Sequence, residues 1–165
     1  MSIKLKKKLL LLGGNGKIGS QIALKFLENN YQVIIVDKIN TKFKKNTKNL
    51  YFEKINFKNI KNIEKNLKRV LKKYGTPDTL IYASYPTTKD WINCSFDKIK
   101  LNYFLENLNI HLGSYYWSSK VIADHMKKKN QGSIIMISSI YSVVSQDPEL
   151  YKGTNLVDNQ VYPII

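Results

Sequence analysis

The chain has 165 residues, enough for one domain with a hydrophobic core, and 43% of them are hydrophobic, which excludes a disordered protein. No apolar run approaches the roughly 20 residues of a membrane-spanning helix, and Leu9–Leu12 is too short for a signal peptide. The single cysteine excludes an intrachain disulfide, and the two histidines, His111 and His125, argue against a His-rich metal site. We therefore expect a cytoplasmic protein that binds no membrane and no metal.

The formal net charge of +15 suggests a polyanionic partner. Arg69, however, is the only arginine, and sites that read nucleic-acid bases favour the bidentate guanidinium group. The lysines are also spread along the chain. We interpret them mainly as a solvated surface and predict no specific nucleic-acid partner. A basic protein that binds RNA or membrane surfaces is the alternative.

In chain order, Lys8–Leu12 predicts a first buried strand. Lys17–Asn29 predicts an amphipathic helix, because its apolar residues fall on one face at helical spacing. Gln32–Val36 is rich in β-branched residues and predicts a second strand. After a loop rich in lysine and asparagine, Leu50–Ile55 predicts a third strand.

The stretch Lys58–Tyr74 has apolar residues three and four apart and predicts an amphipathic helix that stops at a glycine. Thr79–Ala83 predicts a fourth strand. A long helical region from Asp97 to Lys129 follows, and Ser133–Ser138 predicts a fifth strand. Strands that alternate with helices are typical of a parallel sheet. We expect one α/β domain, a Rossmann-type doubly wound parallel sheet.

Three glycines, Gly13, Gly16 and Gly19, lie between the first strand and the first helix. Glycine there allows a tight turn, lets the backbone approach a pyrophosphate and packs the helix close to the strand. The helix N-terminus adds free N–H groups and the positive end of a dipole. The pattern predicts a dinucleotide-binding loop in which a side chain at Gly13 would meet the phosphates. A simple tight turn is the alternative.

Asp37 ends the second strand. A carboxylate there can accept hydrogen bonds from both ribose hydroxyls of NAD and repel the 2′-phosphate of NADP, so we expect NAD as the cofactor. Lys38 follows directly and weakens that repulsion, which leaves NADP as an alternative. An ordinary strand-end turn residue is the structural alternative for Asp37.

The glycine loop resembles the motif Thr-Gly-x-x-x-Gly-x-Gly of the short-chain dehydrogenase/reductase family. Gly13, Ile18 and Gly19 fall in place, whereas the threonine and the middle glycine of the motif are replaced. Gly16 supplies the spacing Gly-x-x-Gly-x-x-Gly found in sugar-modifying relatives. The resemblance implies that these four residues bind the cofactor.

A second family motif, Asn-Asn-Ala-Gly after the fourth strand, corresponds here to Tyr82-Ala83-Ser84-Tyr85. This is a departure, because the first asparagine of the motif normally ties strands together and the motif lines the cofactor site. The resemblance still implies that Ala83, together with Asn56 after the third strand, lies beside the cofactor.

Three residues match catalytic positions of the family. His111 falls where the family has its active-site asparagine, and a half-buried structural histidine is the alternative. Ser139 follows the fifth strand in the register of the catalytic serine. Tyr162 matches the tyrosine of Tyr-x-x-x-Lys, in which a phenol passes a proton and a lysine on the same helix face lowers its pKa. The printed sequence ends before that lysine.

The resemblance implies an NAD(P)-dependent oxidoreductase that transfers a hydride between the cofactor and an alcohol or carbonyl of a small-molecule substrate. Tyr85-Pro86 and residues 151–154 resemble a subgroup associated with surface-sugar and nonulosonic-acid synthesis, which implies a sugar-like substrate. The intact family fold implies a homo-oligomer. We expect residues 1–165 to form a single domain that stops before the catalytic lysine and the distal strands. An inactive fragment with residual nucleotide binding is therefore the alternative.

Overall fold

The computed structural model describes residues 6–40, 43, 47–88, 98–144 and 147–154. Within these ranges, parallel strands form one sheet in the order β3-β2-β1-β4-β5. The strands are β1 Lys8–Leu12, β2 Gln32–Asp37, β3 Leu50–Lys54, β4 Thr79–Tyr82 and β5 Ser133–Met136. The α-helices are α1 Lys17–Glu28, α2 Ile63–Tyr74 and α3 Leu101–Lys128, and short 3-10 turns are η1 Ile60–Asn62, η3 Ile140–Ser142 and η4 Pro148–Tyr151. The predicted doubly wound α/β fold is confirmed.

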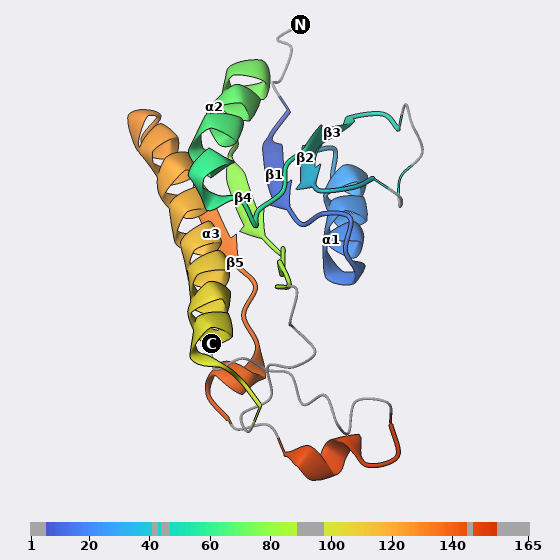
Figure 1. Cartoon of the computed structure of the whole chain (residues 1–165). Helices are drawn as coiled ribbons and strands as arrows, with labels where there is room; N and C mark the ends of the chain where they lie inside the picture. Colours follow the sequence, from blue (N-terminus) through green and yellow to red (C-terminus); the bar gives the residue numbers. More distant parts are fainter. Residues whose placement is uncertain (1–5, 41–42, 44–46, 89–97, 145–146, 155–165) are drawn as a thin grey trace, which may run out of the picture.

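Helices cover both faces of the sheet, with α1 on one side and α2 and α3 on the other (Figure 1). Side chains alternate between the faces of a strand, so Leu10 and Leu12 pack toward α2 and α3, whereas Leu9 and Leu11 pack toward α1. All four leucines are buried. A strand that is buried on both faces must be apolar throughout, which explains the continuous run of leucines in β1.

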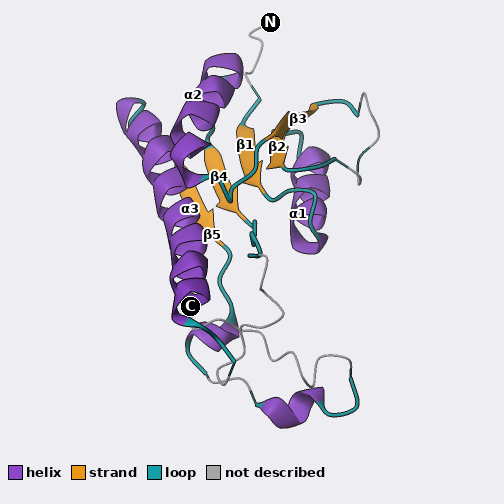
Figure 2. Ribbon diagram, in the orientation of Figure 1, coloured by secondary structure: helices purple, strands orange, loops and turns teal. Residues whose placement is uncertain are grey.

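The predicted elements differ from the observed ones mainly at their ends. The helix expected from Lys58 begins instead with η1, and α2 starts only at Ile63. The cause lies at Asn56, whose side-chain oxygen accepts a hydrogen bond from the N–H of Lys58 at 3.1 Å and holds the preceding segment in a turn. The fifth strand also ends early, at Met136, and loop follows it (Figure 2).

The helices end where glycine or asparagine can take a positive φ angle. Gly75 follows α2 at φ +79°, and its N–H donates to the carbonyl of Leu71. Asn30 and Asn130 take φ angles of 62° and 51° just beyond α1 and α3. No helix in the described ranges combines the length and the apolar character that crossing a membrane would need.

Candidate functional site

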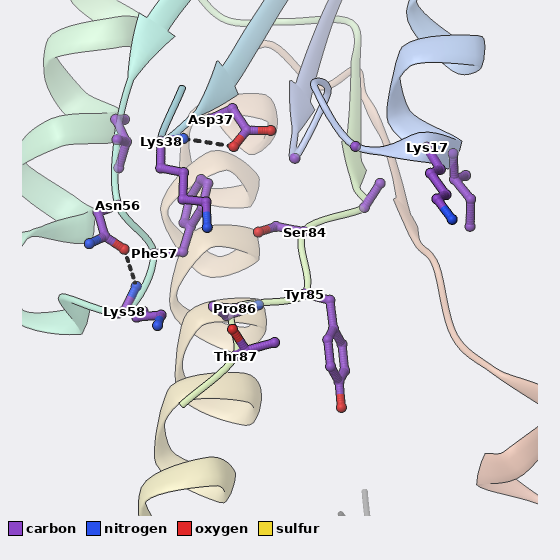
Figure 3. Close-up of a pocket in the computed structure, with 15 residues that line it drawn as sticks. Lys17, Asp37, Lys38, Asn56, Phe57, Lys58, Ser84, Tyr85, Pro86 and Thr87 are labelled. Atoms are coloured by element: carbon purple, nitrogen blue, oxygen red, sulfur yellow. Dashed lines mark hydrogen bonds between the residues drawn. The ribbon is translucent and has the colours of Figure 1, made fainter. Parts of the chain in front are cut away.

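A cavity of about 330 Å³ opens at the carboxyl ends of the strands, between the loops that follow β1, β2, β3 and β4 (Figure 3). The chain passes from β1 outward to β3 and then returns to the other side of β1 with β4. Open α/β sheets bind ligands in the crevice at such a reversal. The cavity is lined by Gly13, Gly16, Lys17, Ile18, Asp37, Lys38, Ile55, Asn56, Phe57, Lys58, Ala83, Ser84, Tyr85, Pro86 and Thr87.

The three glycines of the loop have different structural roles. A Cβ atom at Gly13, which has φ +82°, would lie 2.5 Å from the Cα and N atoms of Ser84. A Cβ atom at Gly19 would lie 2.3 Å from the carbonyl oxygen of Gly13. At Gly16 the nearest atom is 3.4 Å away, so the protein itself leaves room there. The expectation that a side chain at Gly13 would meet the phosphates is therefore corrected, because it would first meet the backbone of the loop after β4.

Helix α1 begins directly at this loop. Its N-cap residue is Gly16, which has no side chain to accept a hydrogen bond from the first turn. That turn also contains no acidic residue. The N–H groups at the start of an α-helix have no partner within the helix. They and the positive end of the helix dipole are therefore available to an anion in the cavity.

Asp37 connects the end of β2 to the glycine loop. One of its carboxylate oxygens accepts a hydrogen bond from the N–H of Asn15 at 3.0 Å, and the other accepts from the N–H of Lys38 at 2.7 Å. The carboxylate is thus held in place from both sides by the backbone. It fixes the loop against the sheet and also presents its remaining lone pairs to the cavity.

Three lysines and one carboxylate, that of Asp37, line the cavity. Figure 3 shows Lys38 and Lys58 on the side of the cavity where Asp37 lies, and Lys17 on the opposite side. The ion pairs of the described residues involve other lysines. The lining therefore carries a formal excess of two positive charges, which suits a ligand with several negative charges.

Six of the seven residues predicted to bind the cofactor line the cavity. These six are Gly13, Gly16, Ile18, Asp37, Asn56 and Ala83. The seventh, Gly19, lies behind the loop, where it allows α1 to pack closely. The N–H of Ala83 donates to the carbonyl of Leu12 at 2.8 Å, which carries the pairing of β4 with β1 up to the cavity.

Tyr82 corresponds to the first asparagine of the motif Asn-Asn-Ala-Gly, but it forms a different contact with the rest of the fold. It is fully buried, and its hydroxyl donates to Oγ of Ser114 on α3 at 2.8 Å. Ser114 in turn donates to the carbonyl of His111 at 3.1 Å. Burial raises the pKa of the Tyr82 phenol far above its ordinary value, so this residue stays neutral. The hydrogen bond between Tyr82 and Ser114 joins β4 to α3. The sequence motifs did not predict this contact.

His111 is buried, only 4% exposed, and lies just behind the cavity lining. Its ring stacks against Tyr85, with 4.2 Å between the ring centroids. Its Nε2 atom has no hydrogen-bond partner among the described residues. Burial lowers the pKa of this imidazole, which favours its neutral form.

Of the other two predicted catalytic residues, Ser139 does not line the cavity. Ser139 is exposed, and its Oγ accepts a hydrogen bond from the N–H of Tyr141 at 3.3 Å, so it caps the turn η3. Tyr162 lies outside the described residues.

Comparison with known proteins agrees with this architecture. The short chain dehydrogenase family matches residues 7–149, and the chain belongs to this family. A curated relative, the post-translational flagellin modification protein A of Campylobacter coli, is 26% identical over 96% of this chain. A 3-oxoacyl-[acyl-carrier-protein] reductase of Buchnera aphidicola is 28% identical over 82% of it. The chain spans 65% and 55% of the lengths of these two proteins.

Solved structures show the same fold. The structure of ElxO with NADP bound is 27% identical, with a TM-score of 0.72 over 86% of this chain and 59% of the other. A short chain dehydrogenase from Leptospira borgpetersenii with bound NAD+ has a TM-score of 0.77 over 95% of this chain and 63% of the other. At 22% identity, the second likeness concerns the fold alone.

Proposed function

We propose that the chain binds a nicotinamide dinucleotide, NAD or NADP, in the cavity beside the glycine loop. The observation that carries this proposal is the position of the cavity, at the reversal of strand order and at the N-terminus of α1. The basic lining suits a pyrophosphate, and two similar structures contain bound NADP and NAD+. The residues present fit such a cofactor.

We further propose that the protein is an oxidoreductase. When bound, the cofactor accepts or donates a hydride. For oxidation of an alcohol, the protein would have to supply a base that takes the hydroxyl proton. The family resemblance assigns the base to Tyr162, the hydrogen bond to the substrate oxygen to Ser139, and a supporting role to His111. Buried and neutral, His111 can both donate and accept a hydrogen bond.

A sugar-like substrate belongs to the same proposal. Its support is the resemblance of Tyr85-Pro86 and residues 151–154 to sugar-modifying relatives, together with the flagellin modification protein found among similar proteins. A cytoplasmic location and a homo-oligomeric state are also proposed, in line with the family.

The first test is titration of NADH and NADPH against the protein, followed by fluorescence. We expect saturable binding, which an excess of the non-fluorescent oxidised dinucleotide should reverse. The absence of binding for both nucleotides would contradict the proposal. The second test is turnover of the cofactor with a panel of sugar alcohols and ketones. Binding without any turnover would support the alternative of a nucleotide-binding protein that is not an enzyme.

A further inference from the structure

A group of exposed lysines lies at the end of the molecule opposite the cavity. Three segments supply them: the residues before β1, the end of α2 and the end of α3. We call the group the basic end, and its members are Lys6, Lys7, Lys72, Lys127, Lys128 and Lys129. None of them forms an ion pair with another described residue.

Hydrogen bonds hold these three segments together. The side-chain ammonium of Lys8, the first residue of β1, donates to the carbonyl of Tyr74 at 2.7 Å, and Tyr74 is the last residue of α2. The ammonium of Lys129 donates to the carbonyl of Thr76, just beyond α2, at 3.3 Å. Figure 1 shows the last turns of α2 and α3 and the start of β1 at the same end of the molecule. The positive charges of the basic end are therefore concentrated on one surface.

The acidic residues near the basic end already have partners. The carboxylate of Asp78 accepts a hydrogen bond from the N–H of Lys8 at 2.7 Å. Asp124, one turn before the end of α3, pairs with Lys120 at 2.7 Å. Lysines in the last turn of a helix also complement its dipole, but the segment before β1 has no helix to stabilise. The charge of the basic end is thus available to an anionic partner.

An exposed aromatic ring lies beside these cations. Tyr51, the second residue of β3, is 40% exposed, and its ring packs on that of Tyr74 with 5.3 Å between the centroids. The hydroxyl of Tyr74 donates to Glu53 at 2.9 Å, which holds the supporting ring in place. Proteins that bind single-stranded nucleic acids combine cations that contact the phosphates with aromatic rings on which bases stack.

Exposed aliphatic surface does not accompany the lysines. Among the described residues, neither α2 nor the last turn of α3 exposes a large apolar side chain. A helix that lies on a membrane buries an apolar face below the lipid headgroups. The surface therefore suits a nucleic acid better than a lipid bilayer. Because the basic end contains no arginine, its lysines can contact phosphates without reading base edges.

We infer that the basic end binds the sugar–phosphate backbone of a single-stranded nucleic acid without base-sequence preference, and that Tyr51 stacks against one of its bases. DNA and RNA share this chemistry. The length of β1, about 16 Å, separates the basic end from the cavity, so the two sites are distinct. The inference does not depend on the nucleotide or the reaction proposed above.

The first test is the fluorescence anisotropy of labelled oligo(dT) and oligo(U), titrated with the protein at low salt. Saturable binding with a Kd of about micromolar is expected. The logarithm of the association constant should fall against the logarithm of the salt concentration with a slope of about −4, as expected when six lysines neutralise phosphates of a single strand. The tighter of the two oligonucleotides identifies the source as DNA or RNA. Absence of binding for both, or binding that salt does not weaken, would overturn the inference.

Two double variants at opposite ends of α3 locate the contact. Lys127→Gln with Lys128→Gln should weaken oligonucleotide binding by about tenfold and reduce the salt slope by about 1.4. Lys98→Gln with Lys100→Gln removes the same charge from exposed positions just before α3, and it should change the affinity by less than about twofold. Circular dichroism checks that both variants are folded. Equal losses in the two variants would show that net charge alone matters and would overturn the assignment.

Substitutions at Tyr51 test the stacking contact. Tyr51→Ala should weaken single-stranded oligonucleotides by about fivefold or more and leave a duplex of the same length unaffected, because paired bases are not available for stacking. Tyr51→Phe keeps the ring and should bind as the parent does. Tyr116→Ala removes another exposed tyrosine, in the middle of α3, and is the matched control. Unchanged binding by Tyr51→Ala, or an equal loss for strand and duplex, would overturn the stacking contact.

Two competitors separate the basic end from other binding sites. Saturating NADH should leave the oligonucleotide bound, because the cavity lies at the opposite end of the strands. Release by NADH would place the nucleic acid in the cavity and overturn the inference. Vesicles of phosphatidylcholine and phosphatidylserine, added at equal phosphate concentration, should also leave it bound. Complete release by the vesicles would overturn the inference in favour of a membrane surface.

Discussion

A Cβ atom at Gly16 would meet only the carbonyl oxygen of Gly13, at 3.4 Å, whereas one at Gly13 would meet the backbone of Ser84 at 2.5 Å. Gly16→Val should therefore leave the protein folded and reduce dinucleotide affinity by about tenfold or more, because the side chain extends into the cavity. Gly13→Val should instead lower the free energy of unfolding by about 3 kcal/mol or more. Urea unfolding and NADH titration measure the two effects, and equal stability of both variants would contradict this division of roles.

Cofactor preference depends on the balance between Asp37 and the lysines beside it. Asp37→Asn removes the charge but keeps an acceptor for one of the two backbone N–H groups, so it should strengthen NADPH binding relative to NADH. Asp37→Ala also removes the hydrogen bonds to Asn15 and Lys38, so it should weaken both nucleotides. Titration of both nucleotides against each variant checks this, and identical behaviour of the two variants would show that the backbone contacts do not matter for binding.

The contribution of the lysines to cofactor preference can be tested separately at Lys58. Lys58→Ala should weaken NADPH more than NADH, by about threefold to tenfold, because the ammonium group of Lys58 in the cavity lining would attract the added negative charge of a 2′-phosphate. Lys54→Ala is the matched control, since Lys54 is exposed on β3 and does not line the cavity. Equal effects of the two variants would indicate general electrostatics and no local contact.

At the scale of elements, α3 carries a buried polar histidine whose protonation should affect stability. Burial lowers the pKa of His111 below its ordinary value of 6.5, so the unfolded chain takes up a proton at a higher pH than the folded one. The stability is therefore complete above pH 6.5 and decreases as the pH falls below that value. His111→Asn should flatten this dependence, whereas His125→Asn, on the same helix, should retain it. Urea unfolding as a function of pH is the measurement.

A second group whose protonation should affect stability is the carboxyl group of Glu53 on β3. The carboxylate of Glu53 is bound by Lys73 at 2.8 Å, by Arg69 at 3.4 Å and by the hydroxyl of Tyr74 at 2.9 Å. Burial alone would raise the pKa of this carboxyl, but the hydrogen bonds and charges of these residues lower it below its ordinary value of 4.5. Its contribution is present above pH 4.5 and is lost as the pH falls through the lower pKa of the folded state. Glu53→Gln should cost about 1 kcal/mol at neutral pH and show a weaker acid transition.

The fold could be predicted because each strand and helix has a strong local pattern. β1 is a run of leucines and α2 has apolar residues at helical spacing, so the presence and type of both elements follow from neighbouring residues alone. The start of α2 could not be predicted, because the turn before it is held by one hydrogen bond that the side chain of Asn56 accepts from the N–H of Lys58. Glycine spacing likewise predicted the loop but not which glycine has room for a side chain.

Parts of the site depend on contacts between residues that are far apart in the sequence. No local sequence pattern predicts such contacts. Tyr82 and Ser114 are 32 positions apart, and nothing near either residue indicates that their hydroxyls meet. The same holds for Tyr85 and His111, which stack only because the loop after β4 lies over α3. Motif matching placed Ser139 at the site by register, but its hydroxyl caps a turn in the structure.

At the scale of the whole molecule, the two edges of the sheet are unequal. On β3 the buried charge of Glu53, held by cations of α2, makes the outer strand a poor template for another strand. On β5, Ile135 and Met136 are 43% and 47% exposed, and no described strand pairs with its outer side. The outer side of β5 is therefore a better template for a further strand than the outer side of β3. The two edges of the sheet thus differ in how readily they accept another strand.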